Sequence, residues 1–196
     1  YRGKDNRRVP SVTEILAIAG VSTDFERVPP EVLERARDRG ARVAKAIEDE
    51  YLGARELVFE PEIAGYMAAW RRFRAEVPSF AVIAVEEPVL HVAYGYGGTL
   101  DLRGDELDLH GKAFEHWIYD VKCTYAVPDE AGLQLAGYAL ALPKGPLYRR
   151  AVLQLKPNGT CVRVEYRNRR EDEHDFLAAL RVARWRLNHG LAQLED

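Results

Sequence analysis

Three short stretches of this chain carry residues whose types and spacing suit phosphodiester chemistry. Gly98-Thr99-Leu100-Asp101 ends in a carboxylate, and Tyr119-Asp120-Val121-Lys122 places a second carboxylate two residues before an ammonium. Side chains alternate along a strand, so Asp120 and Lys122 share one face. A carboxylate pair can hold a hard divalent cation, and the ammonium beside it can orient or deprotonate an attacking water. In this order the residues describe a metal-dependent phosphodiesterase site.

The third stretch is the helix expected after the Asp120 strand, which carries Gln134 and Tyr138 four residues apart. Residues at i and i+4 lie on one helical face, so both side chains can point toward the carboxylates. The alternative interpretation is ordinary helix packing with a polar tip, and the sequence leaves both open.

In this order the motifs resemble the PD-(D/E)XK nuclease superfamily, specifically its RecB-like exonuclease branch. That branch includes CRISPR-associated RecB-like, phage and mitochondrial genome maintenance exonucleases. The resemblance covers most of the chain, with motifs at 9–13, 39–43, 98–101, 119–122 and 134–138 and a pair of strands within 150–166. It implies an α/β restriction-endonuclease-like core, in which helices flank a mixed central sheet and an N-terminal helical region precedes it.

The resemblance also assigns roles to the site residues. Asp101, Asp120 and the carbonyl of Val121 would hold Mg2+ or Mn2+, as one ion or as two, and Lys122 would position or activate water. Gln134 and Tyr138 would contact the DNA backbone or steady the attacking group. The expected partner is DNA, as single strands or ends. A further acidic group near the metal would come from Glu86 or Glu87.

One position departs from the family pattern. The family places a metal-binding histidine after Arg-Gly-X-X-Val, whereas this chain reads Arg39-Gly40-Ala41-Arg42-Val43-Ala44. Alanine has no ligand atom, so we expect a weakened or inactive nuclease, whether the alanine is natural or a substituted histidine. Glu48 or His91 is a conceivable replacement ligand, although an ordinary surface or partly buried role is the stronger interpretation of each.

Two other functions remain open at this stage. One is a catalytically degenerate DNA-binding protein of the same fold, in which Ala44 marks a real loss of catalysis. The other is a metal-binding α/β domain with no role in nucleic-acid chemistry.

The composition is typical of one globular domain and does not by itself indicate a nucleic-acid-binding protein. The chain has 196 residues, 47% of them hydrophobic and 30% charged, with a net charge of −3. Local positive patches, rather than the total charge, bind phosphates, so the arginines on the second and third helices are candidate phosphate contacts. The alternative is that these arginines form an ordinary solvated helix face. We single out Arg39, Tyr94 and Tyr96 as candidate substrate contacts.

The two cysteines, Cys123 and Cys161, cannot ligate a four-cysteine cluster, so we expect a member without an iron–sulfur cluster. No secretory signal or membrane-spanning run is evident, which favours an intracellular (cytoplasmic) protein, bacterial or encoded by a phage, that does not engage membranes. Oligomeric state, strand polarity and exonuclease versus endonuclease mode stay undetermined.

Hydrophobic periodicity and turn residues give the expected elements. We expect one nuclease domain over 1–196, mainly helical over 1–78 and with the sheet core over 79–196. The strand at 80–92 is apolar on both faces, so we expect it to be central and covered by helices. Helices are expected over 13–19, 30–51, 62–76, 130–142 and 170–189, and further strands over 99–103, 106–110, 115–124, 148–156 and 161–166.

Overall fold

The computed structural model describes residues 1–3, 8–23, 28–54, 59–108 and 110–194. Three helices come first: α1 (Val12–Ala19), α2 (Pro30–Tyr51) and α3 (Pro61–Glu76). Three strands follow, β1 (Ala81–His91), β2 (Tyr96–Leu107) and β3 (Phe114–Lys122), and then α4 (Ala131–Ala141) and a short 3-10 turn (Gly145–Leu147). The chain continues through β4 (Tyr148–Leu155) and β5 (Cys161–Glu165) to α5 (Arg169–Asn188).

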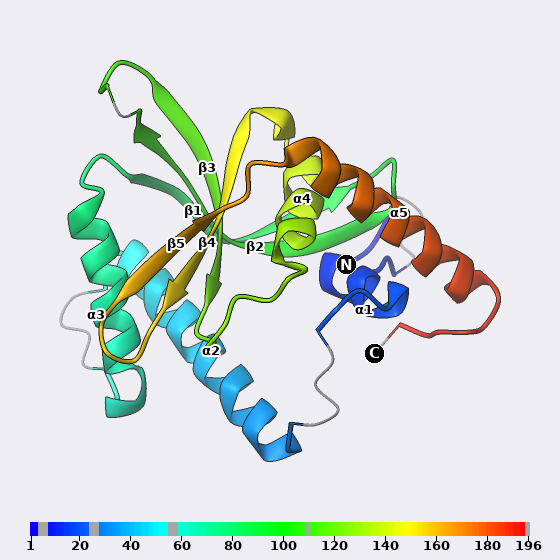
Figure 1. Ribbon diagram of the computed structural model, residues 1–196, viewed down its shortest axis with the longest axis horizontal. Coiled ribbons are helices and arrows are strands. Elements are labelled where there is room, and N and C mark those ends of the chain that lie inside the picture. Colours follow the sequence, from blue (N-terminus) through cyan, green and yellow to red (C-terminus); the bar gives the residue numbers. More distant parts are fainter. Residues whose placement is uncertain (4–7, 24–27, 55–58, 109, 195–196) are drawn as a thin grey trace.

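Within these residues five strands form one mixed sheet in the order β1-β2-β3-β4-β5. Neighbouring strands are antiparallel except β3 and β4, which run parallel because α4 carries the chain back between them. Helices α1, α4 and α5 cover one face of the sheet, and α2 and α3 cover the other (Figure 1). The expected arrangement of helices flanking a mixed sheet is therefore observed.

The helix ends follow from local chemistry. Ser11 and Glu14 form a capping box at the start of α1, and Gly20 ends that helix in the left-handed conformation. Pro30 and Pro61 occupy the first turns of α2 and α3, where a missing N–H costs nothing.

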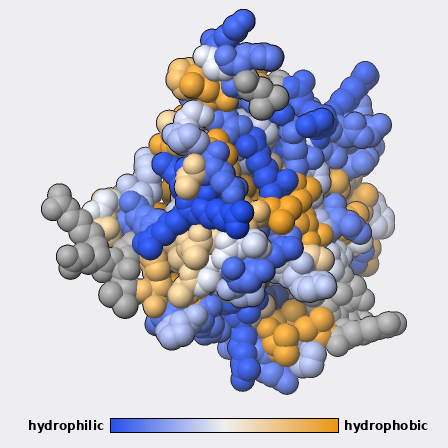
Figure 2. Space-filling view, turned by 60° about the vertical axis from the view of Figure 1, so that its left-hand side comes forward, coloured by the Kyte–Doolittle hydropathy of each residue, from blue (hydrophilic) through white to orange (hydrophobic). Residues whose placement is uncertain are grey.

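Two separate hydrophobic cores lie on the two faces of the sheet. On the first face, Leu135 and Ala136 of α4 pack with Phe176 of α5 and Ile118 of β3. On the second, Met67 and Trp70 of α3 pack with the ring of Tyr119. Outside the cores, Figure 2 shows a surface on which hydrophilic side chains surround separate hydrophobic patches. No helix in the described part of the chain is long and apolar enough to cross a membrane.

Strand β1 corrects one expectation, because it is an edge strand rather than a central one. Ile83 and Leu90 are 40% and 38% exposed. The apolar run in the sequence therefore did not indicate whether β1 has neighbouring strands on one side or on both. Pro88 was the overlooked signal, since a proline cannot donate to a sheet ladder and is confined to edges. A bulge between Val82 and Ala84 interrupts the same strand.

Strand β2 is also longer than expected. The strand predicted over 99–103 and the first two residues of the one predicted over 106–110 belong to one continuous strand, which ends at Leu107 and pairs with β1 on one side and β3 on the other. Asp101 lies in the middle of this strand. The chain turns at Gly111 between β2 and β3, where the carboxylate of Asp108 accepts hydrogen bonds from the amides of His110 and Lys112.

Two helical glycines make a matched test of packing. A Cβ on Gly65 of α3 would lie 1.8 Å from the carbonyl oxygen of Pro157, whereas a Cβ on Gly40 of α2 would meet nothing within 4 Å. We expect Gly65→Ala to lower the free energy of unfolding by about 1–3 kcal/mol through overpacking. Gly40→Ala should raise it by about 0.5–1 kcal/mol, because alanine loses less backbone entropy on folding. Urea unfolding measures both free energies. Equal effects of the two substitutions would contradict the close approach of α3 to the carbonyl of Pro157.

Candidate active site

The candidate site lies where β2 and β3 separate. Their pairing runs as far as Leu102 opposite Tyr119, while β3 stays paired with β4 as far as Lys122. Asp101 and Asp120 are the next residues after that last pair, one on each strand. The amide of Val121 donates to Oδ2 of Asp101 at 2.7 Å, so a carboxylate spans the separating strands. The separation thus brings together the two carboxylates that the sequence singled out.

A chain of polar contacts runs from Asp120 to α4. Nζ of Lys122 lies 3.0 Å from Oδ1 and 2.9 Å from Oδ2 of Asp120, and it also donates to Oε1 of Gln134 at 3.3 Å. Nε2 of Gln134 donates in turn to the hydroxyl of Tyr138 at 3.2 Å. Gly98 allows this, because a Cβ there would lie 2.6 Å from the Tyr138 ring. Lys122, Gln134 and Tyr138 therefore form one connected network beside the carboxylates.

The electrostatics of this network are those of buried charge. Burial, followed by the repulsion of Asp120, raises the pKa of Asp101 well above its usual range. Burial also lowers the pKa of Lys122, but the carboxylates of Asp120 and Asp101 outweigh it, so the net shift is upward and the ammonium stays charged. Burial and the nearby Asp101 raise the pKa of Tyr138. The site therefore carries a fixed positive charge against two mutually repelling carboxylates.

The carboxylates fit the demands of a hard divalent cation. Asp120 is 1% exposed, and its buried Oδ2 accepts no hydrogen bond from the described residues despite the nearby ammonium. Two carboxylates this close together, one of them ion-paired with an ammonium, are a suitable ligand set for a metal that prefers oxygen. However, the described ranges contain no group of three or more His, Cys, Asp or Glu side chains placed to hold a metal ion.

Glu86 approaches the site from β1. Val85 pairs with Leu102 and Glu87 with Leu100, so Glu86 stands in register with Asp101. Its backbone has φ of +50°, a left-handed conformation that is unusual for glutamate. Its charge adds to the repulsion that raises the pKa of Asp101. Of the two glutamates considered from the sequence, Glu86 is the one near Asp101, because Glu87 is paired with Arg103.

Helix α2 brings Ala44 to the same side of the molecule. The hydroxyl of Tyr51 donates to the carbonyl of Ile83 in β1. Burial and, after it, the charge of Glu48 raise the pKa of Glu86. Ala44 lies one turn before Glu48 on this side of α2 and is half-buried. The position lacking the family ligand therefore faces the strand that carries Glu86.

The two suggested replacement ligands lie in different surroundings. Glu48 is held by an ion pair with Lys45 at 2.9 Å. His91 pairs with Tyr96, five residues along β2 from Asp101, or about 17 Å at the rise of a strand. His91 therefore does not reach the site.

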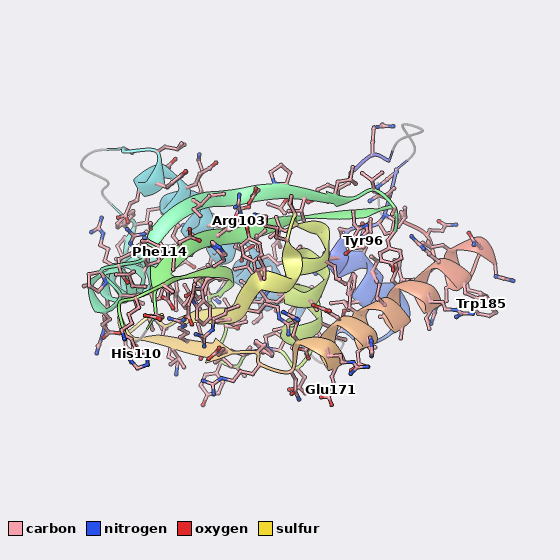
Figure 3. All side chains as sticks on the ribbon, turned by 90° about the horizontal axis from the view of Figure 1, so that it is seen from above. Tyr96, Arg103, His110, Phe114, Glu171 and Trp185 are labelled. Carbon is pink, nitrogen blue, oxygen red and sulfur yellow. The ribbon has the colours of Figure 1, made fainter. Side chains whose placement is uncertain are left out.

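The two tyrosines proposed as substrate contacts lie at that distant end of β2. Tyr96 is fully buried next to α1 (Figure 3), and its hydroxyl donates to the carbonyl of Gly137 at 2.9 Å. The expectation that Tyr96 touches substrate does not fit this burial, because no part of the ring reaches the surface. Tyr94 is 40% exposed, but its ring packs at a tilt against His91, and it lines a pocket together with residues of α5.

Arg39, the third proposed contact, does lie beside the site. Its guanidinium donates to the carbonyl of Cys123 at 3.1 Å, directly after Lys122. It lines a cavity of about 600 Å3 together with Tyr66, Cys123, Thr124, Tyr125, Lys156, Pro157 and Asn158. We call this cavity the β3–β4 groove.

Three of the other arginines on α2 and α3 are instead neutralised locally. Arg42 is paired with Asp38, Glu60 and Glu62, Arg71 with Glu50, and Arg72 with Glu76. These ion pairs favour the interpretation of a solvated helix face for Arg42, Arg71 and Arg72.

Sequence reasoning missed Tyr125 and Lys156 of the groove. Each follows the end of a strand, Tyr125 after β3 and Lys156 after β4. Because the carboxyl ends of parallel strands meet at one edge, the parallel pairing of β3 with β4 brings these segments together. The helical pattern of 130–142 between two strands was the available signal for this pairing.

The fold and the site together define the restriction-endonuclease-like α/β class, as expected from the sequence. The sequence profile described as the PD-(D/E)XK nuclease superfamily matches residues 14–191. The chain belongs to this superfamily.

Comparison with solved structures finds an alkaline exonuclease from Laribacter hongkongensis at 14% identity. It covers 93% of this chain and 94% of that chain, with a TM-score of 0.40. The same exonuclease in complex with dAMP is 13% identical, with 94% and 95% covered and a TM-score of 0.36. The search of curated proteins found no match. The family assignment rests on the profile match.

The contact between Gln134 and Tyr138 can be tested by a double-mutant cycle. Gln134 is 8% exposed and Tyr138 4%, so removing one partner leaves a buried polar group unpaired. We expect Gln134→Leu and Tyr138→Phe each to lower the free energy of unfolding by about 1–3 kcal/mol. The double variant should lose less than the sum, because the two residues share one hydrogen bond. Strict additivity in denaturant unfolding would show that the contact contributes nothing.

Proposed function

We propose that this chain is a metal-dependent deoxyribonuclease of the exonuclease type, acting on single-stranded DNA or DNA ends, in a weakened or inactive form. The observation that carries the proposal is the separation of β2 from β3, which sets Asp101 and Asp120 side by side with Lys122 ion-paired to Asp120. Membership of the nuclease superfamily supports the reaction class.

Asp101, Asp120 and the carbonyl of Val121 would hold Mg2+ or Mn2+, the ions that suit oxygen ligands. When bound, such a cation lowers the pKa of a water molecule and offsets the negative charge of the phosphate. PD-(D/E)XK nucleases generally use divalent metals, which agrees with this donor set.

The protein side chains would then position the reactants. The ammonium of Lys122, 22% exposed, has one face on Asp120 and can offer its remaining protons to an attacking water or to a phosphate oxygen. Gln134 fixes the orientation of Lys122, and Tyr138 fixes Gln134. The network therefore holds the lysine at the carboxylates before any substrate arrives.

Ala44 is the reason to propose a weak or inactive enzyme. The two carboxylates lack a third side-chain ligand among the described residues, and Ala44 lies on the side of α2 that faces Glu86. Loss of one ligand weakens metal binding and so reduces the stabilisation of the transition state. The same observation favours a second candidate function, a catalytically degenerate protein that binds DNA without cutting it.

Metal binding provides the first test of the site. Titration calorimetry with Mn2+ should show binding to the chain that Asp120→Asn weakens by at least tenfold, about 1.4 kcal/mol, because a ligand oxygen becomes an amide. Asp105→Asn is the matched control, since Asp105 lies on β2 together with Asp101 but pairs with His116. Equal affinities in the wild type, Asp101→Asn and Asp120→Asn would refute the assignment.

Restoring an imidazole at position 44 provides the second test. We expect Ala44→His to raise metal-dependent cleavage of end-labelled single-stranded DNA at least tenfold over the given chain, with Mn2+ benefiting more than Mg2+ because imidazole suits the softer ion. Chelator should abolish the gain, and Asp120→Asn in the same background should remove it.

Ala41→His is the matched control, because Ala41 is an exposed alanine on the same helix. It should leave cleavage unchanged. Vigorous cleavage by the wild-type chain with no gain from Ala44→His would show that no metal ligand is missing at position 44. DNA binding without cleavage in every variant would instead favour the second candidate function.

A further inference from the structure

The side chain of Tyr125 is exposed to an unusual degree for a large aromatic residue. Its exposed fraction is 101%, although it lies only three residues after the end of β3. An aromatic ring held entirely in water gains nothing for folding, since burial of apolar surface is what stabilises the folded state. Its position is therefore better explained by a ligand than by packing.

The backbone beneath this ring is nevertheless fixed. Nε2 of Gln154, a residue 6% exposed, donates to the carbonyls of both Thr124 and Tyr125, at 2.9 and 2.7 Å. The hydroxyl of Thr124 donates to the carbonyl of Ala126 at 2.7 Å. The segment after the Asp-X-Lys motif is thus anchored to β4, and only the Tyr125 ring projects outward.

Two cations share the β3–β4 groove with Tyr125. Arg39 and Lys156 both line it, and no carboxylate of the described residues lies within ion-pair distance of either. This contrasts with Arg42, on the same helix as Arg39, which is held by three carboxylates. In an acidic protein, unneutralised cations beside an exposed ring match the requirements of a nucleic-acid strand, whose phosphates need charge and whose bases need a stacking surface.

The groove also lies next to the proposed catalytic groups. Tyr125 follows Lys122 by three residues, so their Cα atoms are no more than about 10 Å apart. The charges of Asp101 and Lys122 both act on Cys123 in the groove wall, which places the groove and the carboxylates in one electrostatic neighbourhood. A strand bound in the groove can therefore present its phosphate to the site.

We propose that Tyr125 is a base-stacking residue and that the β3–β4 groove is the track for a single DNA strand, with Arg39 and Lys156 holding its phosphates. This inference rests on the proposed function and extends it to the substrate form that the site selects. Bases inside a duplex are covered by their neighbours, so a protruding tyrosine can stack only on an unpaired or terminal base. Tyr125 would thus give the preference for single strands.

The test is a binding measurement with the full chain and fluorescently labelled oligothymidine, compared with a labelled, covalently closed duplex minicircle, which has neither an unpaired nor a terminal base. Anisotropy titrations in low salt are run both with Mn2+ and with EDTA, so that binding is read independently of cleavage. We expect Tyr125→Ala to weaken single-strand binding about tenfold and duplex binding less than twofold. Tyr125→Phe, which keeps the ring, should stay within twofold of the wild type.

Trp185→Ala is the matched control. Trp185 is 55% exposed and lies near the C-terminal end of α5 (Figure 3), where it lines a different pocket that shares no residue with the β3–β4 groove. Its loss should leave both affinities unchanged. Arg39→Gln and Lys156→Gln should each reduce the slope of log affinity against log salt for the single strand by about 0.7.

The outcomes separate this inference from the proposed function. If the wild type binds single strands and Tyr125→Ala binds them equally well, the stacking role is refuted while the proposed function stands. Equal losses in Tyr125→Ala and Tyr125→Phe, or equal losses for single strand and duplex, would also overturn it. Failure of the wild type to bind either DNA would instead refute the proposed function itself.

Discussion

The separation of β2 from β3 after the pair Leu102–Tyr119 is the constraint on which the candidate site depends. Had the two strands stayed paired, the amide of Val121 would face β2 as a ladder donor instead of donating to the carboxylate of Asp101. Next to this separation, the carboxylate of Asp120 is ion-paired with the ammonium of Lys122. The local break in backbone pairing thus leaves room for a cluster of oxygen atoms that can act as metal ligands.

The rest of the fold maintains this break. Helix α4 connects β3 to β4 in parallel and also carries Gln134, which holds Lys122 against Asp120. Phe176 of α5 packs behind the same helix. On the opposite face, Trp117 and Tyr119 stack with ring centroids 5.4 Å apart and keep β3 in place. Connection, packing and the candidate chemistry are therefore properties of the same few elements, and disturbing α4 would affect all three.

Sequence patterns were informative where a local rule decided the structure. The capping box at Ser11 and the Gly111 and Gly159 turns follow from one or two residues, and so does the shared face of Asp120 and Lys122. Properties set by tertiary neighbours were not recoverable. The edge position of β1 depends on strand order, the burial of Tyr96 depends on α4, and the exposure of Tyr125 depends on its anchoring by Gln154. Charge total was likewise uninformative, because local ion pairs decide which arginines remain available.

The irregular strand β1 has a consequence for how the molecule behaves in concentrated solution. An exposed sheet edge invites a second chain to add a strand, which is a route to aggregation. In β1 the bulge at Val82–Ala84, the left-handed Glu86 and the proline at position 88 all interrupt the row of backbone donors and acceptors. The strand that brings Glu86 to the carboxylates thereby resists edge-to-edge pairing between copies. Substitutions that made β1 regular would therefore be expected to make the sheet edge more prone to aggregation.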